Sequence, residues 1–376
     1  MKIKINEIGT RCQFIDAAKT SAIFLVLFYH VGPMRGDSLV STSDCTTYIK
    51  YFFLGFSTIG VPLFFTINGY LLLARPLNFE KHIFKTMRLY LLTLVWSLIT
   101  VLCVTIIGRD RYTTSEFLRA VFLLKQGVND HLWFLFALVS IYLLFPVIKI
   151  AFDFSDKRII WWLLFVFFLF SFTNLFANWC LHILNYLRGH QIGVGGEYIK
   201  THQPFDTQGI NPFSGYYWAF VYFIVGGLLR RHLAKDHKLI PVWGLFVLFL
   251  ISALVLFEYG VIVSRYLDGK MFDTVFDGYS SIPCLIMTLS IFIILYRLWN
   301  ADGKAAVFTS SVGANTLGIY FLHFPILTFL NPYYYDMKIS KVMIASMGYA
   351  VTILLLSWML TLTFKRVPVI LYLFRL

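Results

Sequence analysis

The chain has 376 residues, and its composition excludes an ordinary water-soluble protein. Apolar residues make up 59% of it and charged residues only 14%, with a mean hydropathy of +0.73. Soluble domains carry about 25% charged residues. The net charge of +13 does not indicate nucleic-acid binding, because no basic patch interleaved with aromatic residues is long enough. Lys and Arg in short loops on one side of a membrane explain the same charge.

Ten apolar stretches follow one another along the chain, and each is about long enough to cross a hydrocarbon core of ~30 Å as a helix. A helix satisfies its backbone hydrogen bonds within its own segment, as a membrane requires. The sequence therefore predicts an all-α fold, a polytopic transmembrane helix bundle that forms one membrane-embedded domain over residues 1–376. The sixth stretch is short and the ninth contains Pro325, so their boundaries are the least defined. The expected spans lie near 14–34, 49–73, 89–107, 131–152, 159–178, 216–229, 240–263, 279–299, 314–331 and 342–364.

The loops predict the orientation of this bundle. Ten spans put both termini on one side, whose loops hold 19 Lys and Arg against 12 on the other side. The positive-inside rule then places both termini in the cytoplasm. The first stretch is not a cleavable signal, because it contains charged residues and lacks a small-residue cleavage site. The longest connection, 179–215, lies outside and is either functional or a plain connector.

The five Cys residues are scattered without a C-x-x-C motif, which argues against zinc or thioredoxin-like chemistry. Cys45 and Cys180 both fall in expected outer loops, and their spacing leaves a disulfide between them open.

Three ionisable residues mark one face of the first expected span. Lys19 and His30 are eleven residues apart, close to three helical turns and roughly 16 Å along the axis. Asp16 precedes Lys19 by three residues and falls on the same face. Ionisable groups inside a membrane are costly and by default indicate function. This polar stripe suits a water-accessible channel or a substrate tunnel. Alternatively, Asp16 and Lys19 form an interfacial ion pair and His30 only packs between helices.

His30 can serve as a proton relay, a metal ligand or a general base. No second His or carboxylate stands nearby at ligand spacing, so the sequence predicts no metal. The ordinary pKa of histidine lets it take and return a proton near neutral pH, which suits the activation of a hydroxyl group.

Four ordered motifs give the chain a family resemblance. Lys19-x10-His30 resembles the Arg/Lys-x10-His signature of the acyltransferase-3 family of membrane acyltransferases. The stretches VPLFFTINGYLL (61–72), HLWFLFAL (131–138) and LGIYFLHFPI (317–326) resemble its second-span, fourth-span and late motifs. This sequence departs from the family pattern twice, with Lys19 where Arg is commoner and Asn68 where Ser is usual. Lys keeps the charge but lacks the planar fork of Arg for phosphate.

The resemblance implies a membrane O-acyltransferase. Such an enzyme transfers an acyl group, usually acetyl from cytoplasmic acetyl-CoA, to a hydroxyl of an extracytoplasmic cell-surface glycan. His30 would be the catalytic residue, the lipid bilayer of the bacterial inner membrane would surround the protein, and no nucleic acid would be bound. The resemblance does not identify the glycan acceptor, and the acyl group is acetyl or a relative such as succinyl.

The expected topology divides the candidate residues between two depths. Asn68 and Tyr70 approach the cytoplasmic face, where cations can bind the phosphates of acyl-CoA. Plain positive-inside charge is the alternative for each of these cations. The predicted donor-binding set is Lys19, Asn68, Tyr70, Arg75, Lys85 and Arg88. The predicted acceptor or tunnel set, with core packing as its alternative, is Asp16, His131, Trp133, Tyr320 and His323.

A transporter or flippase for glycans or other small solutes is the alternative function, with the polar stripe as its pathway. A non-catalytic membrane scaffold is a third reading. Dependence on acyl-CoA distinguishes the enzyme from both.

Overall fold

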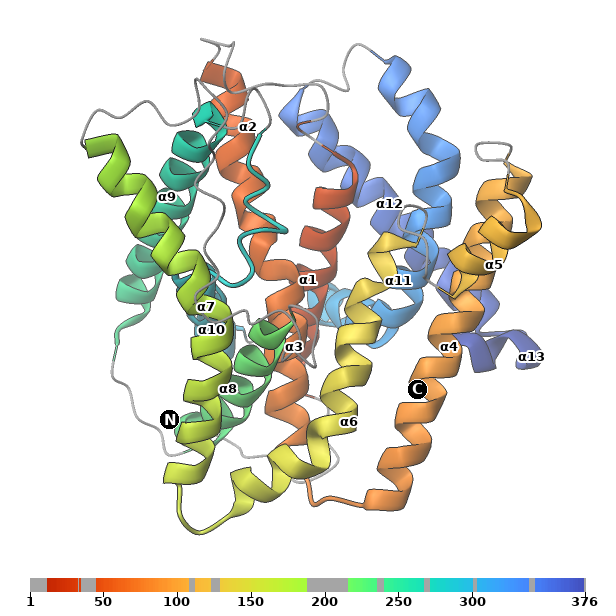
Figure 1. Cartoon of the computed structure of the whole chain (residues 1–376). Coiled ribbons are helices and arrows are strands. Elements are labelled where there is room, and N and C mark those ends of the chain that lie inside the picture. Colours follow the sequence, from red (N-terminus) through yellow and green to blue (C-terminus); the bar gives the residue numbers. More distant parts are fainter. Residues whose placement is uncertain are drawn as a thin grey trace.

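The computed structural model describes residues 12–32, 34, 45–107, 112–122, 129–187, 216–234, 240–266, 271–299, 303–337 and 342–374. All regular structure among these residues is helical, with no strand, so the predicted all-α class is confirmed. The helices run side by side, with α1 in the middle of the bundle (Figure 1). The helices are α1 (Gln13–His30), α2 (Cys45–Gly55), α3 (Gly60–Leu72), α4 (Phe79–Ile106), α5 (Thr114–Val121), α6 (Trp133–Asp153), α7 (Arg158–Leu187), α8 (Tyr217–Leu233), α9 (Val242–Tyr266), α10 (Ile282–Leu298), α11 (Gly303–Asp336), α12 (Met343–Phe364) and α13 (Pro368–Leu371). Short 3-10 turns are η1 (Phe56–Ile59), η2 (Asp130–Leu132) and η4 (Tyr372–Phe374).

The predicted apolar stretches fall mainly on these helices, with 49–73 divided among α2, η1 and α3, and the protein is a multi-pass membrane protein. Among the described residues, six helical stretches are long and apolar enough to cross a membrane, and the number ten stays a prediction. These six are Cys45–Leu72, Phe79–Ile106, Trp133–Asp153, Val242–Ser264, Gly303–Asp336 and Met343–Phe364, and Arg158–Thr173 and Ile282–Leu298 are shorter apolar helices.

Two helices extend well beyond the predicted stretches. Helix α4 begins ten residues before the apolar stretch 89–107, because Asn78 caps it and accepts a hydrogen bond from the Lys81 amide at 3.1 Å. Helix α11 continues from Gly303 to Asp336 through Pro325. Membrane helices tolerate proline, because neighbouring helices and Ser or Thr side chains can satisfy the backbone groups that it frees. Of the connection 179–215, the structure describes only 179–187, as the end of α7.

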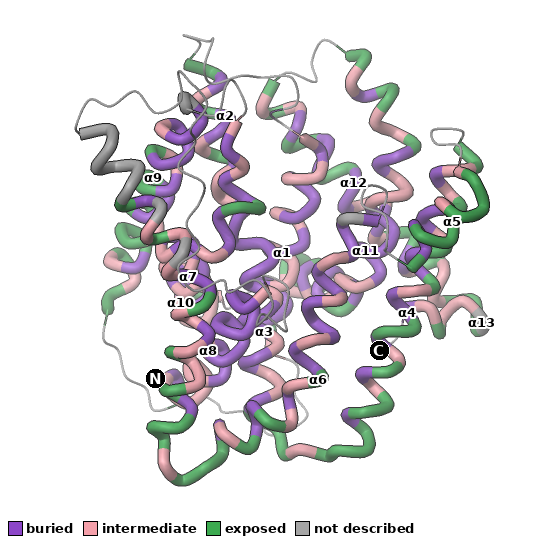
Figure 2. Tube along the Cα trace, viewed as in Figure 1, coloured by how far each residue is buried: buried purple, intermediate pink, exposed green. Residues whose placement is uncertain are grey.

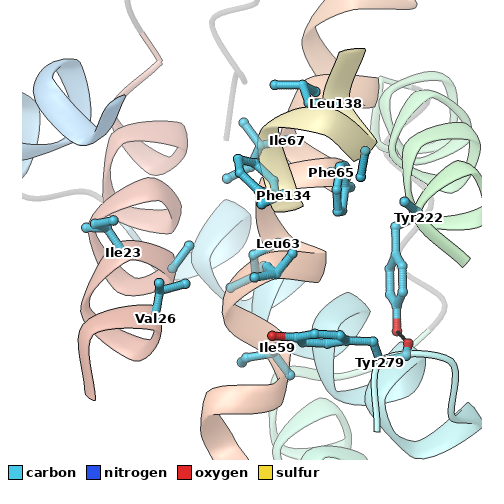
Figure 3. Packing of buried hydrophobic residues seen from close by; sticks show 14 of the residues in the cluster. Ile23, Val26, Ile59, Leu63, Phe65, Ile67, Phe134, Leu138, Tyr222 and Tyr279 are labelled. Atoms are coloured by element: carbon cyan, nitrogen blue, oxygen red, sulfur yellow. Dashed lines mark hydrogen bonds between the residues drawn. The ribbon is translucent and has the colours of Figure 1, made fainter. Parts of the chain in front are cut away.

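Glycines let the central helices α3 and α8 approach each other closely. A Cβ atom on Gly69 of α3 would lie 1.8 Å from the carbonyl oxygen of Phe223, and one on Gly226 of α8 would lie 2.1 Å from that of Thr66. Small residues at such contacts are the usual means of packing helices in a membrane. Aromatic and aliphatic side chains fill the space around them, including Phe65 and Phe134 (Figure 3).

The peripheral helices carry many exposed residues (Figure 2), and large apolar side chains are among them. Examples are Phe84 of α4, Trp243 of α9 and Ile344 of α12, which are 72%, 71% and 79% exposed. Apolar area on this scale would be unstable in water and is suited to lipid. The burial pattern therefore agrees with a helix bundle in a bilayer.

Candidate active site

A small pocket lies where the end of α1 meets η2, the start of α6, the connection before α10 and the middle of α11. Its lining includes Tyr29, His30, His131, Trp133, Tyr279 and Tyr320. Four of the residues predicted from the sequence, His30, His131, Trp133 and Tyr320, are thus brought together from three distant parts of the chain. The remainder of the wall is mostly apolar, formed by residues such as Val26 of α1 (Figure 3) and Val61 of α3, with Ser57 of η1 among them.

Three histidine rings stand close together at this pocket. The ring centroid of His323 lies 5.2 Å from that of His30 and 5.7 Å from that of His131. His30 is half-buried, whereas His323 is fully buried. His30 and His131 line the pocket, and His323 lies behind them. A partly accessible imidazole beside a small pocket is positioned to exchange a proton with a bound hydroxyl group.

His131 is held in place from two sides. Its ring stacks on Phe324, with centroids 4.2 Å apart and an angle of 8° between the planes. Its carbonyl oxygen accepts a hydrogen bond from the Tyr320 hydroxyl. The turn of α11 that carries His323 therefore also holds the residues just before α6 in place.

An aromatic wall closes another side of the pocket. Trp133 stacks on Tyr216 with ring centroids 5.4 Å apart, and it lies 5.7 Å from Tyr279 and 5.8 Å from Phe276. The Tyr222 hydroxyl of α8 donates a hydrogen bond to the Tyr279 carbonyl at 2.9 Å (Figure 3). The wall is thereby tied to the central helices.

The sequence analysis did not identify the link between this wall and α1. The Tyr29 hydroxyl, next to His30, donates to a carboxylate oxygen of Asp273 at 2.5 Å. The other oxygen of Asp273 accepts the amides of Val275 and Phe276 at 2.9 and 3.0 Å. One carboxylate thus both shapes the turn and attaches it to the helix that carries His30. The only sequence signal was that Tyr29 adjoins His30, which could not indicate a partner 244 residues away.

Asp277 lies in the same connection between α9 and α10, outside the membrane-spanning helices. Partial burial, and then the nearby carboxylate of Asp273, raise the pKa of Asp277 from 3.8 to about 6. The carboxyl group of Asp277 therefore holds its proton to a higher pH than an ordinary aspartate does, because its pKa is raised.

Cations gather near the other end of α1. The charges of Lys19 on α1 and Arg75 before α4 both act on Lys85 of α4. The Lys85 ammonium group lies 5.7 Å from the ring centroid of Tyr142, whose hydroxyl donates to the Asn68 side-chain oxygen at 3.3 Å. We call Lys19, Arg75 and Lys85 the inner cation cluster. Like charges that act on one another are unfavourable, and a bound anion would reduce this repulsion.

Arg88 and Tyr70 also belong to the predicted donor set, and each has its own surroundings. Arg88 is half-buried and follows Lys85 by three residues, on the same side of α4. Tyr70 is buried between Phe14 and Phe292, and the Arg230 guanidinium lies 4.8 Å from its ring centroid. The sequence analysis missed Arg230, whose signal was a cation in the last turn of α8.

Asp16 lies at the contact between α1 and α11, outside the lining of the pocket. It is buried, and its carboxylate accepts a hydrogen bond from Ser310 at 3.3 Å. A Cβ atom on Gly313 would come within 2.8 Å of the Asp16 Cα, so the two helix backbones lie close together here. Asp16 thus faces α11, the helix that also carries His323.

The fold and the pocket define a class of protein: a helical membrane protein with histidines from distant segments at one partly buried site. The chain belongs to the acyltransferase-3 family, because that family's sequence model, described as an acyltransferase domain, matches residues 13–362. This match confirms the resemblance of the four motifs and makes the protein a membrane acyltransferase by family. No curated protein and no solved structure matches the chain.

Proposed function

We propose that the protein is an O-acyltransferase that moves an acetyl group from cytoplasmic acetyl-CoA to a hydroxyl of an extracytoplasmic cell-surface glycan. The observation that carries this proposal is His30, which ends α1 and lines a pocket together with His131 and Tyr320. The protein acts in the bacterial inner membrane with both termini in the cytoplasm, and the bilayer surrounds it.

His30 acts as the general base of the transfer. It removes the proton from the acceptor hydroxyl while that oxygen forms a bond with the acyl carbon of the thioester. The bond between this carbon and sulfur breaks, and the proton passes from His30 to the leaving thiolate. A base positioned in this way typically contributes ~10²- to 10⁴-fold to the rate.

The inner cation cluster supports binding of the donor. Its three positive charges suit the phosphates of acetyl-CoA, and Arg88, Asn68 and Tyr70 complete the proposed donor set. Helix α1 is continuous from Lys19 to His30, which spaces the cluster and the pocket by roughly 16 Å along the helix axis. An extended donor can bridge this distance, with its phosphates at Lys19 and its thioester at His30.

The acceptor binds on the other side of His30 in this proposal. His131, Trp133, Tyr320 and His323 form or support that side, and Asp16 fixes α1 against α11 from below the pocket. Uncharged imidazole and hydroxyl groups in an apolar wall suit a neutral acceptor hydroxyl more than a charged one, because burying an unpaired charge is costly.

The test is the release of thiol from acetyl-CoA by purified protein, combined with mass spectrometry of the cell-surface glycan. We expect His30→Ala to abolish both thiol release and the mass increment of one acetyl group per modified sugar. His232→Ala is the matched control, because it removes a histidine from the last turn of α8 instead of from the pocket. Full activity of His30→Ala would overturn the assignment of His30. Transport of a solute without acyl donor, unchanged in this variant, would favour the transporter.

A further inference from the structure

His323 is the most completely enclosed ionisable group beside the pocket. Its side chain is 0% exposed, and it lies behind the lining, next to the rings of His30 and His131. It is not part of the pocket lining, so it acts on a bound acceptor through the residues that are.

The hydrogen bonds of His323 determine where its ring carries a proton. Its Nδ1 lies 2.5 Å from the carbonyl oxygen of Tyr320. A carbonyl oxygen only accepts, so Nδ1 must be the donor. A neutral imidazole has one donor and one acceptor, which leaves Nε2 with a lone pair. Among the described residues no group hydrogen-bonds to this buried Nε2.

A buried acceptor without a donor is unfavourable, and it calls for a partner in the working enzyme. The titratable rings packed around His323 are those of His30 from α1, His131 from η2 and Tyr320 from its own helix. The Tyr320 hydroxyl already donates to the His131 carbonyl, and the His131 ring stands at 88° to that of His323, with 5.7 Å between their centroids. His30 is the nearest of the three rings, at 5.2 Å between centroids. This spacing suits a hydrogen bond that is direct or passes through one water molecule.

We propose that His323 is a positioning residue for His30. Its Nε2 accepts the N–H of one His30 nitrogen, so that the other nitrogen of His30 faces the pocket with its lone pair. This inference rests on the proposed role of His30 as the base. When the acceptor hydroxyl gives up its proton, His30 becomes an imidazolium whose inner N–H points to His323. The proton then leaves with the thiolate, and His323 keeps its own Nδ1 proton throughout.

The experiment compares two amides at position 323, using acetyl-CoA as the only substrate and water as the acceptor. His323→Gln carries an acceptor near the place of Nε2, whereas His323→Asn reaches only the place of Nδ1 and can still donate to the Tyr320 carbonyl. We expect the Gln variant to keep kcat within about threefold and the Asn variant to lose at least about tenfold, with unchanged KM.

The pH profile separates positioning from packing. An acceptor at His323 stabilises the charged form of His30, so its loss should move the acidic limb of kcat to lower pH in the Asn variant only. Thr328→Val is the control, because it removes a buried hydroxyl from α11 that bonds only to the Phe324 carbonyl of its own helix.

Better activity of Asn than of Gln would show that His323 serves the Tyr320 carbonyl instead of His30. Equal losses in the two amide variants would show that an acceptor at the place of Nε2 is not what the site requires, and either result would overturn the inference. Thermal unfolding verifies that each variant folds, and His323→Leu replaces Asn in the comparison if Asn does not. If His30→Ala loses activity while all variants at position 323 resemble the wild type, the inference about His323 is wrong and the proposed role of His30 stands. If His30→Ala stays active, the proposed function fails as well.

Discussion

The two ends of α1 carry different kinds of site. At the His30 end, rings from α1, η2 and α11 pack against one another within 6 Å. At the Lys19 end, the charges of cationic side chains from α1, from the residues before α4 and from α4 itself act on one another. A rigid group of rings suits chemistry, which requires an exact geometry, whereas flexible cations suit the binding of a charged donor. Mutations at the two ends should therefore act on kcat and on KM respectively.

The largest expected effect comes from a change that removes both sites. Gly69→Ala places a Cβ atom 1.8 Å from the Phe223 carbonyl oxygen, so α3 and α8 must separate. We expect a loss of about 3 kcal/mol, the upper end of typical overpacking costs, and little folded protein in thermal unfolding and gel filtration. Gly348→Ala is the control, because nothing lies within 4 Å of its Cβ position. A wild-type unfolding midpoint for Gly69→Ala would contradict the described contact of α3 and α8.

For Lys85→Met we expect a smaller effect, confined to donor binding at the inner cation cluster. It should raise the KM for acetyl-CoA about two- to fivefold, the equivalent of an ion pair worth up to ~1 kcal/mol, and leave kcat unchanged. Steady-state kinetics at low and high salt measure this. The control Lys157→Met removes an exposed cation from the connection between α6 and α7. A change in kcat instead of KM would mean that the two ends are not separate in function.

The smallest effect concerns the acidic connection beside the pocket wall. The pKa of Asp277 is raised from 3.8 to about 6, so the folded protein binds this proton more tightly than the unfolded chain. Stability should therefore fall as the pH rises from about 4 to 6, and Asp277→Asn should remove this decline. Thermal unfolding between these pH values measures it. Asp156→Asn is the control. Hydrogen bonds from Arg158 lower the pKa of Asp156, so the contribution of Asp156 to stability is lost as the pH falls, not as it rises. A parallel pH dependence of wild type and Asp277→Asn would contradict the prediction.

Much of the bundle could be predicted because membrane helices carry a local signal. An apolar run of sufficient length marked every predicted span. The predicted helix boundaries were wrong where the helix continues into residues that are not strongly apolar. Helix α4 begins at Phe79 and includes the basic residues that precede the predicted apolar stretch. Helix α11 continues through Pro325. Capping by Asn78 and packing by neighbouring helices decided those two cases, and neither is a property of an apolar run.

The site could be predicted only in part. The periodicity of one helix related Lys19 to His30, and the motifs and the expected topology put His131 and His323 on the acceptor side without showing that their rings meet that of His30. Asp273 and Tyr142 carried no signal, and Arg230 carried only that of a cation near a helix end, because their roles depend on contacts with Tyr29, Asn68 and Tyr70 from other helices.

The sequence by itself determined that the protein is a bundle of membrane helices of the acyltransferase-3 family and that His30 belongs to one polar helix face. Both follow from local patterns, since burial in lipid and helical periodicity act within a single segment. Only the tertiary structure decided that His30 meets His131 and His323 at one pocket, and that Asp273 attaches the wall of this pocket to the helix that carries His30. These contacts join residues up to about three hundred positions apart, and helix packing alone brings them together.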